Sequence, residues 1–334
     1  MAKITLAHGG GGEMTHELIQ NVFFKYFGND ILNKAGDSAC LRIEEKNIAF
    51  TTDSFVIQPL FFPGGDIGKL SICGTVNDLA VQAATPKFIS CGFIIEEGFE
   101  EEDLIEIVGS MSEWAKKAGV QIVTGDTKVV EKGAADGLFI NTSGIGVIKE
   151  GICLGKDKIR TGDKIIITGN IGDHGIAILG KRKGLEFESS IVSDCAPLNK
   201  ILTKIMDNVS GVKFMRDPTR GGVATVLNEI AQDARFGVLI DEVKIPVDDG
   251  VRAACELLGL DALYIANEGK ALIIADKDSE EEILNILKQD EYTSNAAGIG
   301  EIVADNAGKV CLKTRYGVVR MIDRLTAEPL PRIC

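Results

Sequence analysis

Short apolar runs of strand length alternate along this chain with longer segments in which apolar residues recur at helical spacing. In the first half, the pattern predicts helices over residues 14–26, 67–84 and 101–118, strands over 87–95 and 122–124, and a hairpin with arms 41–43 and 48–51, and residues 138–148 close this unit. An alternation of this kind favours an α/β or α+β fold.

A second unit follows residues 149–163, a segment rich in glycine and charge that predicts a domain boundary. Beyond it, the pattern predicts strands over 164–168, 238–241 and 270–275 and helices over 198–209, 222–236, 248–258 and 280–287. We therefore expect two α/β domains, residues 1–150 and 151–322, and a flexible tail, residues 323–334.

The composition allows two packed cores and argues against some partners. The chain has 334 residues, of which 45% are hydrophobic, enough for two domains. The 49 Asp and Glu outnumber the 36 Lys and Arg, and the formal charge of −13 argues against a nucleic-acid binder. The sequence contains no apolar stretch of membrane-spanning length, and its eight cysteines form no C-x-x-C pair. We expect a cytoplasmic protein with reduced thiols that binds neither nucleic acid nor membrane.

Four consecutive glycines, Gly9, Gly10, Gly11 and Gly12, precede the first predicted helix. Backbone N–H groups can approach an anion at such a position, and the helix dipole favours negative charge there. The run is neither a Walker loop nor a dinucleotide fingerprint. It predicts either a loop that closes over phosphate groups or a flexible leader.

Four aspartates in the first domain are flanked by small residues: Asp37, Asp53, Asp78 and Asp126. Asp78 stands inside a predicted apolar helix, where an unpaired carboxylate is costly and needs a cation or hydrogen-bond donors. Carboxylates without neighbouring His or Cys suit Mg²⁺, which commonly bridges the phosphates of a nucleotide. The alternative for each is a helix cap or a turn residue.

A further charged group, Arg216, Asp217 and Arg220, precedes a glycine pair and a predicted helix. The arginines can fork onto phosphate oxygens, whereas a simpler interpretation is a capped helix start. Lys128 and Glu268 lie at predicted strand ends and are either site residues or surface charges.

The chain ends in a cysteine, Cys334, that follows two prolines, Pro329 and Pro331. Prolines favour an extended conformation without internal hydrogen bonds. A thiol on such an arm can visit two places, as a swinging carrier does, and the alternative is a frayed terminus.

Together these segments resemble the HypE family of hydrogenase maturation factors, carbamoyl dehydratases in the aminoimidazole ribonucleotide synthetase-like (PurM-like) superfamily. The resemblance covers nearly the whole chain and is carried by residues 7–12, 52–54, 60–65, 72–78, 124–130, 216–222, 266–270 and 329–334. The last segment discriminates, because selenophosphate synthetase and thiamine-phosphate kinase share the aspartates and the glycine loop but lack this tail.

The resemblance implies a two-domain PurM-like fold, with the N-terminal sheets of two subunits forming a barrel at a homodimer interface and ATP bound near it. It implies that the carbamoyltransferase HypF loads a carbamoyl group onto Cys334 and that the tail then enters the chain's own ATP site. ATP-dependent dehydration would give a thiocyanate, which the HypC–HypD complex receives as the source of cyanide for nickel–iron hydrogenases.

The resemblance also implies roles for the residues above. Mg²⁺ would be held by the five aspartates Asp37, Asp53, Asp78, Asp126 and Asp217. The glycine loop, Arg216 and Arg220 would bind ATP, Glu268 would act as the general base and Lys128 would orient the carbamoyl oxygen. Two alternatives stay open: phosphate transfer from ATP to a free small molecule, and a scaffold without catalysis whose nucleotide site is regulatory.

Overall fold

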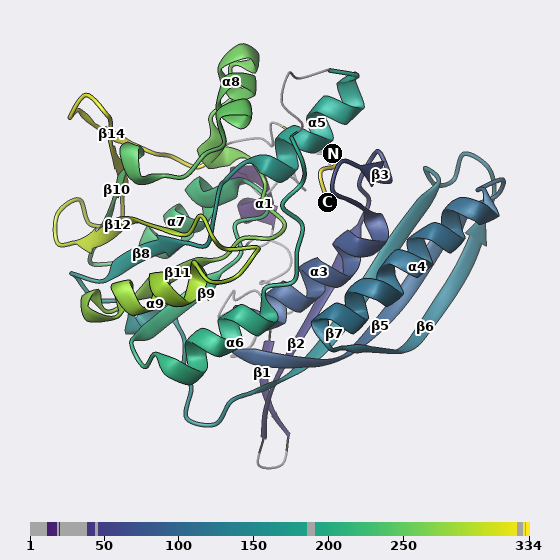
Figure 1. Ribbon diagram of the computed structural model, residues 1–334, viewed down its shortest axis with the longest axis horizontal. Coiled ribbons are helices and arrows are strands. Elements are labelled where there is room, and N and C mark those ends of the chain that lie inside the picture. Colours follow the sequence, from purple (N-terminus) through teal and green to yellow (C-terminus); the bar gives the residue numbers. More distant parts are fainter. Residues whose placement is uncertain are drawn as a thin grey trace.

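The computed structural model describes residues 12–18, 20, 39–43, 46–185, 191–325, 330 and 332–334. Two sheets, each packed against helices, lie side by side (Figure 1). In the described part of the chain, we find no helix with the length and apolarity needed to cross a bilayer.

The N-terminal sheet has five strands in the order β1-β2-β7-β5-β6. Its strands are β1 (Ala39–Ile43), β2 (Lys46–Phe55), β5 (Ala84–Glu96), β6 (Gln121–Val130) and β7 (Leu138–Ile148). Neighbouring strands are antiparallel except β5 and β6, which are parallel and are connected through α4 (Glu101–Ala118). A separate hairpin of β3 (Phe61–Phe62) and β4 (Gly65–Asp66) precedes α3 (Ile67–Ala80).

Helices α3 and α4 lie across one face of this sheet (Figure 1). Helix α3 is buried along almost its whole length, which explains its nearly continuous run of apolar and small residues. It begins where the Asp66 carboxylate accepts hydrogen bonds from the N–H groups of Gly68 and Lys69, two donors that the helix itself leaves without a partner. The cap fixes the start of the helix that carries Asp78.

The opposite face of the N-terminal sheet, called the outer face below, is apolar and open. Phe50, Ile145 and Phe88 are paired across β2, β7 and β5, so their side chains share one face. Each of these three side chains is more than a third exposed, as is Ile94 farther along β5. Four large apolar side chains on one sheet face are typical of a surface that another protein covers.

The C-terminal sheet has seven strands in the order β14-β13-β10-β12-β8-β11-β9. They are β8 (Lys164–Ile167), β9 (Val212–Arg216), β10 (Gly237–Asp241), β11 (Leu272–Ala275), β12 (Ala297–Val303), β13 (Val310–Lys313) and β14 (Val319–Met321). The accompanying helices are α5 (Asp173–Lys183), α6 (Asn199–Asn208), α7 (Gly222–Ala231), α8 (Asp249–Leu258) and α9 (Glu280–Leu287). Alternate residues of β8 and β11 join separate buried clusters on the two faces, so both strands are continuous apolar runs.

Most of the predicted elements are present. Helices α4 and α9 have the predicted bounds, β1 and β2 form the predicted hairpin, and the segment that closes the first unit is strand β7. Helix α3 ends at Ala80, four residues before the prediction, because the chain turns there and enters β5 at Ala84. The predicted helix 14–26 is described only over α1 (Glu13–Leu18), and much of its remainder lies outside the described residues.

Candidate active site between the two domains

The carboxyl groups of Asp53, on β2, and Asp78, on α3, lie within hydrogen-bonding reach of each other. The Thr75 hydroxyl donates to Asp53 at 3.5 Å, and the Thr51 hydroxyl donates to Asp78 at 2.6 Å. Burial raises the pKa of Asp53, and the positive charge of Arg220 opposes that rise. The two acids therefore lie together between β2 and α3, with a guanidinium nearby.

The backbone of Glu268 is fixed from both domains. Its N–H donates to Asp194 Oδ1 at 3.0 Å, and its C=O accepts from Asn77 Nδ2, on α3, at 3.2 Å. Gly269 packs so closely that a Cβ there would lie 1.8 Å from the Asp194 carbonyl oxygen, which only glycine permits. Asn77 also accepts from the N–H of Leu198, so one amide side chain joins α3 to two C-terminal segments.

Glu268 is 4% exposed, and its Oε1 finds no hydrogen-bond partner among the described residues. Burial raises its pKa well above the ordinary value, and the charges of Cys195, Asp217, Asp194 and Asp53 raise it further. A carboxyl group shifted in this direction is a stronger base when ionised, which is typical of acid–base catalysts.

The loop after β9 brings Asp217 into this region. Asp217 is buried, and Asn267 holds the loop by donating to the Pro218 carbonyl at 2.9 Å. The Asn267 Oδ1 accepts from the Gly172 N–H at 2.8 Å, at the start of α5. The Asn267 side chain therefore positions both the loop of Asp217 and the turn before α5. Because Glu268 is the next residue, its backbone is positioned as well.

The two arginines of this loop differ. Arg216 Nη1 lies 2.7 Å from Glu229 Oε2 on α7, so its charge is matched within the C-terminal domain. Arg220 is exposed, and its charge acts on Asp53 across the domain boundary. Of the two, Arg220 is better placed to meet an anion held near Asp53.

Asp126 and Lys128 lie away from this cluster. The prediction that their strand ends at residue 124 was wrong, because β6 stays paired with β5 as far as Val130. Asp126 pairs with Gly92 and so faces the outer side, whereas Asp53 faces α3. The Lys128 ammonium lies 3.0 Å from Asp126, and both side chains are about two-thirds exposed. A single chain therefore does not bring them to Glu268.

Part of the predicted phosphate loop is outside the structure. Gly9, Gly10, Gly11 and Asp37 lie outside the described residues. Gly12 is buried, and its C=O accepts from the His16 N–H at 3.1 Å. The Glu13 N–H donates to the Leu325 carbonyl at 3.0 Å, so the described start of α1 is attached to the first residues of the tail.

The last described residues of the tail, 330 and 332–334, are docked between the domains. The Val56 N–H donates to a terminal oxygen of Cys334 at 3.1 Å, and the Val56 C=O accepts from Arg332 Nε at 2.9 Å. Leu330 and Ile333 are buried in the main hydrophobic cluster, against which Cys334 packs. Figure 1 places this end of the chain near α5 and β3. Val56 is three residues beyond Asp53, so the terminal cysteine sits at the same end of β2 as the acid pair.

The sequence pattern did not single out three buried residues near this site: His174, Asp194 and Cys195. Asp194 Oδ2 lies 3.6 Å from Lys270 Nζ, and its side chain is almost fully buried. Burial raises the pKa of the Cys195 thiol well above its usual range, and a hydrogen bond with Cys73 adds to this. A histidine at the start of an apolar helix, Asp173-His174-Gly175-Ile176, was the one local signal available.

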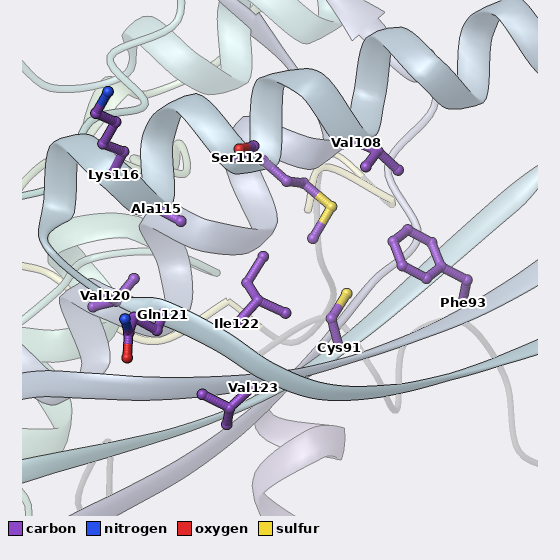
Figure 2. A pocket seen from close by; sticks show the side chains of 11 residues that line it. Cys91, Phe93, Val108, Ser112, Ala115, Lys116, Val120, Gln121, Ile122 and Val123 are labelled. Carbon is purple, nitrogen blue, oxygen red and sulfur yellow. The ribbon is translucent and has the colours of Figure 1, made fainter.

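A cavity of about 680 Å³ lies elsewhere, between α4 and strands β5 and β6. Figure 2 shows Cys91, Phe93 and Ile122 on the side of the strands that faces α4, and Val123 on the other side. Its lining is largely apolar and includes none of the predicted site residues. The chemistry therefore belongs to the domain boundary and not to this cavity.

Comparison with known proteins agrees with this arrangement. Two family models match: AIR synthase related protein, N-terminal domain, over residues 35–148, and its C-terminal domain over residues 160–313. The carbamoyl dehydratase HypE of Escherichia coli K12 is 48% identical over 339 residues, covering 100% of both chains. That of Bradyrhizobium diazoefficiens is 47% identical over 332 residues, covering 99% of this chain and 96% of its own. The chain belongs to the HypE carbamoyl dehydratase family. It is therefore a hydrogenase maturation enzyme of the carbamoyl dehydratase class.

Solved structures of the HypE family show the same PurM-like fold. A HypE protein crystallised with ATP superposes with a TM-score of 0.84 and 44% identity, covering 99% of this chain and 100% of that one. The HypE chain of a HypE–HypF complex superposes with a TM-score of 0.88 and 49% identity, covering 92% of this chain and 99% of that one. The alternative of a scaffold without catalysis is not favoured by these relationships.

Proposed function

We propose that the enzyme acts on its own C-terminus, dehydrating an S-carbamoyl group on Cys334 to a thiocyanate at the expense of ATP. The product would supply the cyanide ligands of nickel–iron hydrogenases. The observation that carries this proposal is the hydrogen bond between the Val56 N–H and Cys334, next to the end of β2 that contains Asp53. A substrate attached to that thiol would enter the region between the acid pair and Glu268 without leaving the protein.

The reaction needs activation because the amide oxygen is a poor leaving group. Transfer of the γ-phosphoryl group to the carbamoyl oxygen turns it into phosphate, and loss of both nitrogen protons then forms the C≡N bond. Glu268 is the proposed acceptor of an N–H proton, because its carboxyl group is buried, lacks a hydrogen-bond partner on Oε1 and has a raised pKa. Its exclusion from water also disfavours ATP hydrolysis, the competing reaction.

ATP binding is supported by the ATP complex of a HypE protein, and the acid pair and the loop of Asp217 are its proposed site. Arg220 is the proposed phosphate ligand in the described part of the chain, with Gly12 at the edge of the glycine loop. Arg216 is the second proposed phosphate ligand, and its Nη1 is already paired with Glu229. Gly9, Gly10 and Gly11 complete the proposed phosphate loop.

The carboxylates of this site fit a Mg²⁺ ion that is bound together with the nucleotide. No group of three or more His, Cys, Asp or Glu among the described residues could hold a metal ion unaided. Mg²⁺, however, is commonly bound by one or two carboxylates plus phosphates, and Asp53 and Asp78 are such a pair. When bound, the ion would neutralise charge on the phosphates. Asp37 and Asp217 are further proposed ligands.

Asp126 and Lys128 can take part only if a second copy covers the outer face. We therefore include a homodimer in the proposal, with the outer faces of two N-terminal sheets forming the interface as a barrel. The exposed Phe50, Phe88 and Ile145 support this arrangement. Lys128, the proposed partner of the carbamoyl oxygen, and Asp126, a proposed metal ligand, would then lie inside the interface.

The proposed partners follow from the chemistry of the tail. The carbamoyl donor would be HypF, which the solved HypE–HypF complex supports. The acceptor of the thiocyanate would be the HypC–HypD complex. Both proteins must reach Cys334. The tail therefore has to leave its docked position between the domains before and after each dehydration.

The proposal is tested on the C-terminal peptide. A carbamoylated chain incubated with ATP should lose the mass of one water from the peptide that contains Cys334, and Cys334→Ser should carry no carbamoyl group at all. Glu268→Gln should keep the carbamoyl group after ATP is added. A soluble phosphorylated product with an unchanged peptide mass would show phosphate transfer to a free small molecule instead.

A further inference from the structure

A buried histidine contacts the last peptide of the chain. His174, on α5, is fully buried, and its Nε2 lies 2.8 Å from the carbonyl oxygen of Ile333, the residue before Cys334. Its Nδ1 lies 2.8 Å from Ser193 Oγ. The edge of the Phe62 ring packs against the imidazole, with centroids 5.6 Å apart and an interplanar angle of 89°. The ring therefore has one orientation, fixed on three sides.

The hydrogen-bond partners define which nitrogen of His174 carries the proton. A carbonyl oxygen can only accept, so Nε2 must donate to Ile333. In a neutral ring Nδ1 then accepts, and the Ser193 hydroxyl is free to donate to it because Ser193 Oγ itself accepts from the Cys195 N–H at 3.1 Å. The chain of donors runs from the Cys195 backbone through Ser193 and His174 to the tail.

The electrostatic surroundings keep this ring neutral. Burial lowers the pKa of His174, whereas the charge of Asp194 and the hydrogen bond to Ile333 raise it by less. The neutral ring keeps the single tautomer that the donor chain requires. Ser193 is itself anchored, since its N–H donates to the Pro63 carbonyl at 2.8 Å in the β3–β4 turn.

The tail is also held by Val56 of the N-terminal domain and by Arg182, which lies farther along α5 than His174. The Val56 N–H binds the terminal carboxylate, and the Arg182 guanidinium donates to the carbonyls of both Gln58 and Arg332. These bonds are made to exposed or half-buried groups, which water can replace at little cost. The bond from His174 is different, because an unpaired Ile333 carbonyl would stay buried without a partner.

We propose that His174, oriented by Ser193, is the receptor for the docked tail and a positioning residue for the dehydration of the group on Cys334. It donates to the peptide next to the cysteine and so sets where the sulfur stops. This role rests on the proposed function, since docking matters for catalysis only if the cysteine carries the substrate. The imidazole does not touch the reacting atoms, so it takes no chemical part in the reaction.

The test compares His174→Phe, which keeps a ring but removes the donor, with His174→Gln, which keeps an N–H near the position of Nε2. Docking is measured by the rate at which iodoacetamide alkylates Cys334, followed by mass spectrometry of the peptide 323–334 released by cleavage before Asp323. That peptide separates Cys334 from the other seven cysteines. Thermal unfolding of both variants shows whether each is folded.

We expect His174→Phe to raise the alkylation rate of Cys334 and to lower the single-turnover dehydration rate, each by about tenfold, the effect of one lost hydrogen bond with a buried acceptor. His174→Gln should stay within about twofold of the wild type. Carbamoylation by the partner transferase should not fall in either variant, because it uses the undocked tail.

Three results would overturn the proposal. Unchanged alkylation in His174→Phe would show that the tail docks without the histidine. Equal damage in both variants would show that only packing matters. Faster alkylation with an unchanged dehydration rate would show that docking does not position the substrate. Failure of the wild-type chain to dehydrate its own carbamoyl group would instead refute the proposed function, and the alkylation rates would still decide the docking.

Discussion

The backbone N–H of Glu268 donates to Asp194 Oδ1, so the proposed base is held in place by a second buried acid. That contact has an electrostatic consequence. The negative charge of Asp194 is among the charges that raise the pKa of Glu268, after burial and alongside Asp217 and Cys195. One side chain therefore both positions the base and increases its basicity.

Replacing Asp194 by Asn should shift the pH dependence of dehydration. The amide oxygen can still accept from the Glu268 N–H, but the charge that raises the pKa of Glu268 is gone. The ionised base is the active form, so the acidic limb of the rate profile should move to lower pH. The measurement is the single-turnover rate of a carbamoylated chain as a function of pH.

Asp248→Asn is the control for this prediction, because Asp248 caps α8 and is not among the charges that act on Glu268. Its profile should overlay that of the wild type. A profile of Asp194→Asn with the wild-type acidic limb would mean that Glu268 is not the titrating base.

Glu268→Gln should abolish dehydration and stabilise the fold at neutral pH. A carboxyl group whose pKa is higher in the folded state binds more protons there, so its contribution to stability falls as pH rises from about 4.3 to the folded-state pKa. Each unit of that difference costs about 1.4 kcal/mol, and Gln avoids the loss. The dehydration rate should fall at least about 100-fold.

Urea unfolding at a series of pH values measures the stability change. The free energies of unfolding of the two proteins should diverge as pH rises above about 4 and stay apart at neutral pH. A difference between the two free energies of unfolding that does not change with pH would contradict a raised pKa of Glu268.

The local sequence pattern was enough to predict elements whose buried residues recur at regular spacing along the chain. Helix α4 was predicted to the residue because its buried positions, Ile107, Met111, Ala115 and Ala118, recur at helical spacing. Strand β6 was cut short because all but its last residue are exposed, so no apolar alternation marks it. Its length is set by pairing with β5, which one segment of sequence does not contain.

The residue types that form the site could be predicted from the sequence, but their positions relative to one another could not. Asp53, Asp78 and Glu268 were identified by residue type and by the family resemblance, and the structure brings them to one region. The separation of Lys128 from that region follows from strand register, which places it on the outer face. The contact of His174 joins residues 159 positions apart, so no local pattern could indicate it.

Gly269→Ala should destabilise the protein and displace Glu268. The added Cβ would lie 1.8 Å from the Asp194 carbonyl oxygen, so the backbone of one segment must move. Overpacking of this kind costs about 1–3 kcal/mol. Gly109→Ala in α4 is the matched control, because a Cβ there meets nothing within 4 Å. It should be neutral or slightly stabilising, and equal unfolding midpoints for the two variants would contradict the contact.

Phe88→Asp should break the proposed dimer. Phe88 lies on the apolar outer face, paired with Ile145, and is 45% exposed in the single chain. A carboxylate buried there in an interface would have no positive partner at the pairing positions around it, and its desolvation should weaken association by at least about 2 kcal/mol. Analytical ultracentrifugation of wild type and variant measures the change in mass.

Leu257→Asp on α8 is the control for this last prediction, because Leu257 is 77% exposed and lies in the other domain. Its mass should match that of the wild type. If Phe88→Asp is monomeric and has also lost dehydration while ATP still binds, the dimer is needed for the reaction, as the proposed role of Lys128 requires. A monomeric variant with full activity would instead remove Lys128 and Asp126 from the reaction, since one chain holds them away from Glu268.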